Sequence, residues 1–259
     1  MNLPVFYDLT EDWNRTMFLY DSALRIVNTK LEIMSNQFMM TNHYNPIEHI
    51  TSRLKTPESI AKKMDHNNRE LTVPNIVKYI NDIAGIRIVC SFESEIYNIA
   101  RLIKKQADIK VLKIKDYIMF PKENGYASYH MIVSVPVYMQ GHAIETKVEI
   151  QIRTIAMDFW ASLEHKMYYK FEGNAPESIK KELKECAEIA GYLDRKMMAI
   201  NNEIKGYNKE GERMPDYNST VYASDEDFGK LVDDDADVLG HSADVDEDVD
   251  KSFENWESF

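Results

Sequence analysis

Residues 148–153 alternate between apolar and polar side chains, and this alternation constrains the fold more than any other part of the chain. Side chains of a strand point in turn to opposite faces of a sheet, so the apolar set can face a core while the polar set faces away. The polar set is Glu149, Gln151 and Arg153. A merely solvated sheet face would show the same alternation. We expect one sheet face that carries a carboxylate, an amide and a guanidinium together.

The order of patterns around this segment predicts an alternating α/β region. Thr56 and Pro57 have the residue types of an N-cap and a first helical position. The predicted strands are 49–55, 86–92, 109–115, 130–138 and 144–153. One predicted helix begins at residues 56–57, and three more span 74–83, 94–106 and 155–171.

Long apolar stripes on both sides of this region predict two amphipathic helices, over 13–38 and 179–204. Both helices could pack on the core, and they could also build a subunit interface. These two interpretations can hold together.

The acidity of the chain is confined to its C-terminal end. Residues 224–259 hold fourteen acidic and two basic side chains, which accounts for the whole net charge of −12. The remaining body has 29 basic and 29 acidic residues and is neutral. A neutral body argues against a general nucleic-acid binder. We expect a folded body over 1–206 and an acidic, disordered tail over 207–259, which either keeps the protein soluble or contacts a basic partner.

The two cysteines, Cys90 and Cys186, have no metal-ligand spacing and cannot make a disulfide framework. We expect both to be buried thiols in a reducing cytoplasm, with Cys186 on the apolar face of its helix. No apolar run approaches the roughly 20 residues of a membrane helix, and the N-terminus lacks the pattern of a signal peptide. The sequence therefore predicts a cytoplasmic protein with no membrane contact.

Residues 115–130 combine lysines, tyrosines, an Asn-Gly turn, a serine and a histidine between two predicted strands. Such a loop offers cations for phosphate and a flat ring for a base. Tyr126, directly after the turn, could present its ring for stacking, or could serve as a partly buried anchor. His130 could bind phosphate or be a satisfied structural histidine.

Several cations upstream share faces with one another. Arg53 and Lys55 are two residues apart on a strand, and Ser59 and Lys63 are four apart on a helix. The helix start near Pro57 adds backbone N–H groups that favour anions. The chain has no Gly-x-x-x-x-Gly-Lys loop, so side-chain cations and a metal would have to hold a triphosphate. Each lysine alone could equally be a solvated surface charge.

Two acidic residues at strand ends, each near an arginine, suit a Mg²⁺ site that faces phosphates. Asp82 precedes a predicted strand on which Arg87 points opposite its apolar neighbours, and Glu149 shares its face with Arg153. Magnesium is typically bound by one or two carboxylates together with phosphate oxygens.

Four ordered motifs together resemble the synthetase domain of the RelA/SpoT family, and the chain is similar in length to the stand-alone small alarmone synthetases. They are Arg53-x-Lys55 with Ser59 and Lys63; Asp82-Ile83-Ala84-Gly85-x-Arg87; Lys115-Asp116-Tyr117-Ile118 with Pro121-Lys122-x-Asn124-Gly125-Tyr126-x-Ser128-x-His130; and Glu149-Ile150-Gln151-Ile152-Arg153-Thr154.

The resemblance implies a nucleotidyltransferase-like mixed sheet flanked by helices. It also implies transfer of pyrophosphate from Mg-ATP to the 3′-OH of GDP or GTP, with (p)ppGpp and AMP as products. The residues implied to bind ATP are Arg53, Lys55, Ser59, Lys63 and Arg87. Those implied to bind the acceptor are Lys122, Asn124, Tyr126, Ser128, His130 and Gln151. Those implied for Mg²⁺ and catalysis are Asp82 and Glu149, with Glu149 as the general base.

Two departures from the family pattern concern the acceptor: Glu123 stands where many members have Pro, and Ala127 where many have Arg. The second loses a cation and could change the choice among GMP, GDP and GTP. The chain contains no His-Asp dipeptide, which predicts synthesis without hydrolysis. The resemblance also suggests a homotetramer. The alternatives are a toxic relative that pyrophosphorylates the 3′ end of tRNA and a non-catalytic nucleotide-binding module.

Overall fold

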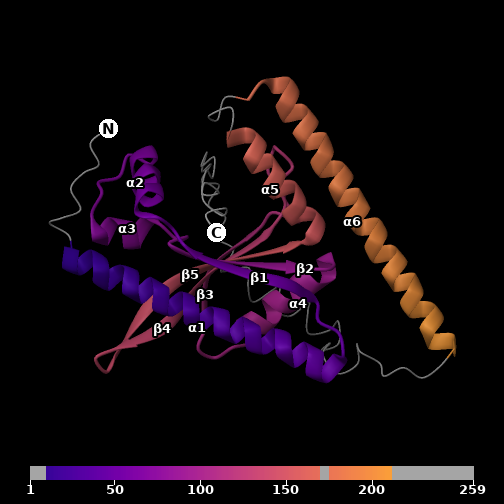
Figure 1. Ribbon diagram of the computed structural model, residues 1–259, viewed down its shortest axis with the longest axis horizontal. Helices are drawn as coiled ribbons and strands as arrows, with labels where there is room; N and C mark the ends of the chain where they lie inside the picture. The colour runs from indigo at the N-terminus through magenta and orange to yellow at the C-terminus, as the bar shows by residue number, and fades with distance from the viewer. Residues whose placement is uncertain (1–9, 170–174, 212–259) are drawn as a thin grey trace. The chain divides into compact units, whose positions relative to one another are not determined.

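The computed structural model describes residues 10–169 and 175–211, which fall into two units. The first unit, up to Arg195, contains one five-stranded sheet with the strand order β1-β2-β5-β4-β3 (Figure 1). The described part of the second unit is the helical segment 196–211. The strands are β1 (Ile47–Leu54), β2 (Ala84–Cys90), β3 (Lys110–Asp116), β4 (Tyr129–Met139) and β5 (His142–Thr154). The helices are α1 (Thr10–Asn42), α2 (Pro57–His66), α3 (Val73–Tyr79), α4 (Glu93–Lys104), α5 (Ile155–Tyr169) and α6 (Glu177–Gly211).

The sheet is mixed, as the family resemblance implies. Strand β2 runs parallel to β5, and the three other strand pairs are antiparallel. The β4–β5 hairpin turns at Gln140 and Gly141, and both residues have positive φ angles. The parallel pair brings the chemistry of β2 beside that of β5, although about fifty residues of chain separate them.

One face of the sheet forms the hydrophobic core. The register places Ile86 opposite Ile150 and Ile88 opposite Ile152, and these side chains are buried. Helix α1 lies along this part of the sheet (Figure 1) and adds Leu24, Val27 and Leu31, while α4 adds isoleucines of its own. Their spacing of three and four residues gives each helix one apolar stripe. The predicted packing of the N-terminal helix on the core is confirmed.

The other face of the sheet is polar. Arg87 of β2 pairs with Gln151 of β5, and Gln151 pairs with His130 of β4, so three polar residues form one row across the sheet. Glu149 and Arg53 flank the row, both in register with Gly85. The predicted alternation therefore places the functional candidates of three strands together.

Most element boundaries agree with the sequence to within a few residues. The main difference is the predicted helix 74–83, which ends at Tyr79 as α3. Ile80 has an extended backbone and is buried, as is Ile83. Burial of these two isoleucines explains why apolar residues continue past the end of the helix. Residues 207–211 of the predicted tail belong to α6, and residues 212–259 lie outside the described part of the chain.

Cys90 is buried as predicted, but the predicted burial of Cys186 is wrong, because its side chain is exposed. Helix α6 turns Leu183 and Ala187 toward the body of the first unit. Cys186 immediately precedes Ala187, and one residue along a helix rotates the side chain by about 100°. Its thiol therefore points away from the face that packs.

Most of the apolar stripe of α6 is exposed rather than packed on the core. Leu183 is buried, whereas Leu193 of the predicted stripe and Ile189 nearby are more than half exposed, so the prediction that this helix packs on the core holds only for the beginning of α6. Within 196–211, Met197, Ile200 and Ile204 are exposed as well. The alternative interpretation, a subunit interface, stays a prediction. Among the helices described, none combines the length and the apolar character of a membrane span.

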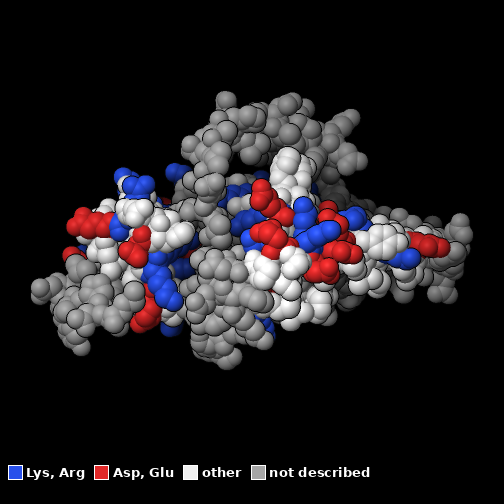
Figure 2. All heavy atoms as spheres, turned by 90° about the horizontal axis from the view of Figure 1, so that it is seen from above, with Lys and Arg blue, Asp and Glu red and all other residues white. Residues whose placement is uncertain are grey.

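Charged side chains of both signs are interspersed on the face drawn in Figure 2. Lys and Arg do not gather there into a single basic field, in line with the neutral balance of the body.

Candidate active site

A closed ring of hydrogen bonds and one His–carboxylate contact occupies the polar face of the sheet. Arg153 donates from Nη2 to the Tyr126 hydroxyl at 2.6 Å and to Gln151 Oε1 at 2.9 Å. Gln151 in turn donates to Glu149 Oε2 at 3.0 Å. His130 closes the ring, with Nδ1 3.3 Å from Glu149 Oε1 and Nε2 2.9 Å from the Tyr126 hydroxyl. We call these five residues the polar ring; it fixes the carboxylate of Glu149 from both sides.

Arg153 is the central member of the polar ring, and its side chain is 0% exposed. A buried guanidinium needs a counter-charge and hydrogen-bond acceptors. Asp158, on the first turn of α5, accepts from Nη1 at 3.2 Å, and Ser128 Oγ accepts from Nε at 3.3 Å. The Ser128 hydroxyl also donates to the Ile152 carbonyl, and Ser128 has no exposed surface. It is therefore held in place as a buried acceptor for Arg153.

Asp158 also contacts a second arginine. The oxygen that meets Arg153 lies 3.1 Å from Nη1 of Arg87, which is nearly buried on β2. Burial and, next, the nearby charge of Arg153 lower the pKa of Arg87 to about 10, and Asp158 opposes both effects. Arg53 of β1 is close enough to act in the same direction as Arg153. Arg87 remains charged at neutral pH, and the face it shares with Arg53 and Arg153 is strongly cationic.

Asp82 lies at the start of β2 between two lysines. Its carboxylate is 2.8 Å from Nζ of Lys55 and 3.3 Å from Nζ of Lys63. Lys55 and Asp82 are both almost completely buried, and burial lowers the pKa of Lys55 while Asp82 raises it. Ser59 stands beside them at the start of α2, where its backbone N–H and its hydroxyl both bond to the cap residue Thr56.

A turn carries the residues predicted to bind the acceptor. Gly125 has φ +89°, and its N–H donates to the Lys122 carbonyl at 2.8 Å. Asn124 Oδ1 accepts from the N–H of Tyr126 at 3.1 Å, and its Nδ2 donates to Glu164 of α5 at 3.3 Å. Burial raises the pKa of Glu164, while Asn124 and Lys122 oppose that shift.

Tyr126 is 3% exposed, so its ring does not stand free on the turn. Lys122 Nζ lies 5.3 Å from the ring centroid and Arg153 Cζ lies 5.1 Å from it. The ring also meets Tyr117 and His130 edge to face, with centroids 5.9 Å away in each case. A base could stack on Tyr126 only after one of these neighbours, such as the Lys122 side chain, moves aside.

The donor set fits magnesium. The described residues hold no cluster of three or more His, Cys, Asp or Glu side chains able to make an all-protein metal site. They offer two carboxylates: Asp82, two residues before β2, and Glu149 on β5, the strand parallel to β2. Magnesium usually takes one or two carboxylates and completes its shell with substrate phosphates and water. Lys55 and Lys63 show that the Asp82 carboxylate already attracts cations.

The structure brings the predicted residues together in two adjoining groups. Lys55 and Lys63 contact the Asp82 carboxylate, and the acceptor turn joins the polar ring through Tyr126. Sequence reasoning gave no role to Arg153 and missed Asp158. Arg153 shares its strand face with two predicted site residues, which is a usable signal. Asp158 has no such signal, because its contacts with Arg87 and Arg153 arise only from the docking of α5.

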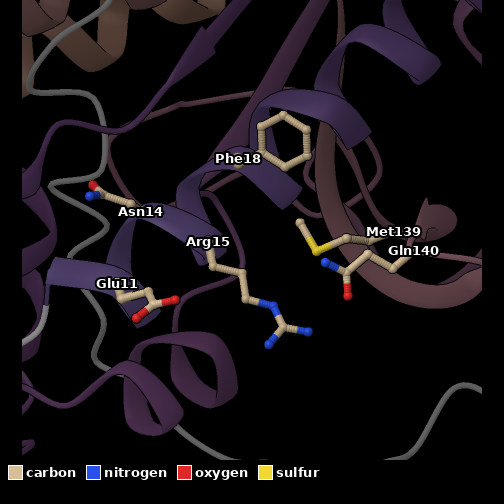
Figure 3. A pocket seen from close by; sticks show the side chains of 6 residues that line it. All are labelled: Glu11, Asn14, Arg15, Phe18, Met139 and Gln140. Carbon is tan, nitrogen blue, oxygen red and sulfur yellow. The ribbon is translucent and has the colours of Figure 1, made fainter.

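A separate cavity of about 560 Å³ lies between the start of α1 and the β4–β5 turn (Figure 3). No residue predicted for substrate binding lines it. The residues that line it are Glu11, Asn14, Arg15, Phe18, Met139 and Gln140.

Comparison with known proteins identifies the relatives of this chain. Residues 52–174 match the region found in RelA/SpoT proteins. The chain is 48% identical over 194 residues to the GTP pyrophosphokinase YwaC of Bacillus subtilis, which covers 75% of this chain and 92% of that protein. It is 35% identical over 196 residues to the GTP pyrophosphokinase YjbM of the same organism, covering 75% and 91%.

Solved structures give the same relationship. The fold matches the small alarmone synthetase 2 of B. subtilis with a TM-score of 0.68 and 48% identity, covering 74% of this chain and all of that one. It matches the small alarmone synthetase 1 of B. subtilis bound to its product pppGpp with a TM-score of 0.71 and 35% identity, covering 75% and 99%. The predicted resemblance is confirmed, and the chain belongs to the RelA/SpoT family, among the stand-alone small alarmone synthetases.

Proposed function

We propose that this enzyme transfers pyrophosphate from ATP to the 3′-OH of GDP or GTP, with (p)ppGpp and AMP as products, and that GMP is a further candidate acceptor. The observation that carries the proposal is the fixed carboxylate of Glu149 on a sheet face crowded with cations. Two related proteins named GTP pyrophosphokinase, and a related structure bound to pppGpp, support the same reaction.

ATP would bind beside β1, β2 and α2. Arg53 and Arg87 lie on one sheet face, close enough for their charges to interact, and flat guanidinium groups stack well on an adenine ring. Lys55 and Lys63 would leave Asp82 to hold the triphosphate, and Ser59 would add its hydroxyl. The exchange keeps the charges balanced, because a magnesium ion would take the place of the two lysines at Asp82.

The acceptor would bind over the turn at 122–126. The Tyr126 ring would stack on guanine, with Asn124 and Gln151 beside the base. Lys122 and His130 would contact the acceptor phosphates, and Ser128 would act through Arg153 rather than by touching the nucleotide. Because the Tyr126 ring is covered in this structure, acceptor binding would include a movement of Lys122.

Asp82 and Glu149 would hold magnesium. The ion, when bound, neutralises charge on the transferring phosphates. The reaction itself needs alignment and charge neutralisation more than covalent help from the protein.

Glu149 is the proposed general base. The 3′-oxygen of the acceptor attacks the β-phosphorus of ATP, its proton passes to Glu149, and the bond from the β-phosphorus to the α,β-bridging oxygen breaks. AMP leaves with that oxygen, and the β- and γ-phosphates remain on the acceptor. Gln151 and His130 hold the two carboxylate oxygens, so Glu149 meets the hydroxyl in a set orientation. Arg87, Lys55 and Lys63 would offset the negative charge of the phosphates.

The remaining predictions complete the proposal. The synthetase domain would end within α6, and the exposed Ile189 and Leu193 would lie in the interface of a homotetramer. Free nucleotides as substrates support a cytoplasmic enzyme that works without nucleic acid or membrane as partner. The acidic tail would act outside the reaction, as a solubilising segment or a contact for a basic partner.

The test is to mix the purified protein with Mg-ATP and, separately, GMP, GDP, GTP or deacylated tRNA, and to follow AMP release and product mass. AMP together with a guanosine nucleotide heavier by one pyrophosphate is the expected result, with loss of both in Glu149→Gln. Transfer to tRNA alone would replace the proposal by the tRNA-modifying alternative. No AMP with any acceptor would point to a non-catalytic nucleotide-binding module.

A further inference from the structure

Asp158 touches both halves of the candidate site from outside them. It stands on the first turn of α5, and one oxygen, Oδ1, lies 3.1 Å from Nη1 of Arg87 and 3.2 Å from Nη1 of Arg153. Arg87 belongs to the ATP side of the proposed site. Arg153 belongs to the acceptor side, because it donates to the Tyr126 hydroxyl and packs over the Tyr126 ring.

We propose that Asp158 is a positioning residue that couples the two nucleotide subsites through this shared oxygen. The inference rests on the proposed function, because it takes Arg87 as a contact of ATP and Tyr126 as a contact of the acceptor. Asp158 itself touches neither nucleotide in this scheme.

The electrostatics make the shared oxygen important. Two guanidinium groups this close repel each other, and the repulsion acts on Arg87 together with its burial. Arg153 cannot relieve it by moving into solvent, since its side chain is completely buried. One carboxylate between the two groups offsets the repulsion and fixes both positions. The side chain of Asp158 is only 19% exposed, so water screens these contacts weakly.

The consequence is a link between the ligands. When adenine contacts Arg87, it holds that arginine in one place, and Asp158 passes the restraint to Arg153. Arg153 then holds the Tyr126 hydroxyl, and with it the ring that the acceptor base would stack on. The first nucleotide thereby lowers the ordering cost of the second, which gives positive coupling. Couplings of this kind typically change an affinity by about 5- to 150-fold.

The experiment measures the dissociation constant of GDP by titration calorimetry, without and with a saturating non-hydrolysable ATP analogue. The ratio of the two constants is the coupling factor. For wild type we expect a factor of at least about 5. For Asp158→Asn, which keeps the shape and removes the charge, we expect a factor below about 2. By reciprocity the affinity for the analogue must show the same factor when GDP is added.

The matched control is Asp194→Asn. Asp194 accepts from the Thr154 hydroxyl at 2.5 Å, beside the same strand end, yet neither Arg87 nor Arg153 is among its hydrogen-bond partners. It should keep the wild-type coupling factor. If Asp158→Asn does not fold, Asp158→Glu takes its place, because one added methylene moves the carboxylate off the position that serves both arginines. Its coupling factor should also fall below about 2.

Two results would overturn the inference: a wild-type protein whose ligands bind independently, or a folded Asp158 variant that keeps the wild-type factor. A purely structural role would lower the melting temperature and weaken each ligand alone but leave the factor intact. Failure of this inference can be distinguished from failure of the proposed function, because AMP release by the wild-type protein with GDP is measured on the same preparation. AMP release with coupling unchanged in Asp158→Asn removes the inference alone.

Discussion

Gly125 is the position where a single methyl group should damage the acceptor turn most. Its φ of +89° is a conformation that costs an L-residue about 1–2 kcal/mol. A Cβ at Gly125 would also lie 2.5 Å from the Cβ of Ala187 on α6, far inside contact distance. Overpacking of this kind costs about 1–3 kcal/mol. Gly125→Ala should therefore destabilise the protein by about 2–5 kcal/mol, which corresponds to a melting temperature lower by roughly 5–15 °C.

A double-mutant cycle separates the two contributions. Ala187→Gly removes the atom that the new Cβ meets, at a cost of about 1 kcal/mol for a glycine inside a helix. Combined with Gly125→Ala, it should recover about 1–3 kcal/mol as coupling energy. Gly141→Ala is the matched control, because Gly141 has φ +83° but no atom within 4 Å of its added Cβ. Gly141→Ala should reduce stability only by the conformational cost of a positive φ angle, and it should show no coupling energy with Ala187→Gly.

The assays are urea denaturation of the three single variants and the two double variants, and steady-state kinetics. Because Gly125 lies between Asn124 and Tyr126, we expect Gly125→Ala to raise the KM of the acceptor more than the KM of ATP. A Gly125→Ala protein as stable as wild type, or one that Ala187→Gly does not rescue, would refute the proposed contact between the turn and α6. An equal rise in both KM values would refute the assignment of the turn to the acceptor.

Three further perturbations test other parts of the site. Glu149→Gln should lower kcat by about 10²–10⁴ with little change in melting temperature, measured as AMP release. Asp82→Asn should abolish activity and cost about 3–5 kcal/mol in urea denaturation, because buried Lys55 loses its counter-charge. Glu164→Gln should stabilise the protein more at pH 8 than at pH 5. The raised pKa of Glu164 means that its contribution to stability is complete below its unfolded value of 4.5 and is lost as pH rises through the folded value, whereas glutamine cannot ionise. If the melting temperatures of Glu164→Gln and wild type differ by the same amount at both pH values, the raised pKa of Glu164 is contradicted.

Alternation made the sheet predictable. Apolar and polar residues alternate so strictly in β5 that the polar face could be assigned from sequence alone, and the register then placed Glu149 and Gln151 on it. The strand order of the sheet then brings the two groups of predicted residues together, because β1, β2 and β5 are neighbours in it. Local patterns succeed here because each reports on one face of one element.

Docking of whole elements could not be predicted in the same way. The contact of Asp158 with two arginines depends on where α5 lies after β5 ends, and no spacing rule encodes that position. The exposure of Cys186 depends on which face of α6 meets Trp160 and the acceptor turn. The covered ring of Tyr126 likewise results from neighbours contributed by several elements.

The most direct test of the central claim is the fate of the terminal phosphates of ATP. Wild-type protein with magnesium, GDP and ATP labelled at the γ-phosphate should release AMP in a one-to-one ratio with a product that carries the label and two added phosphates on its 3′-oxygen. Labelled GTP with ADP as the second product, or label released as free phosphate without AMP, would contradict the account.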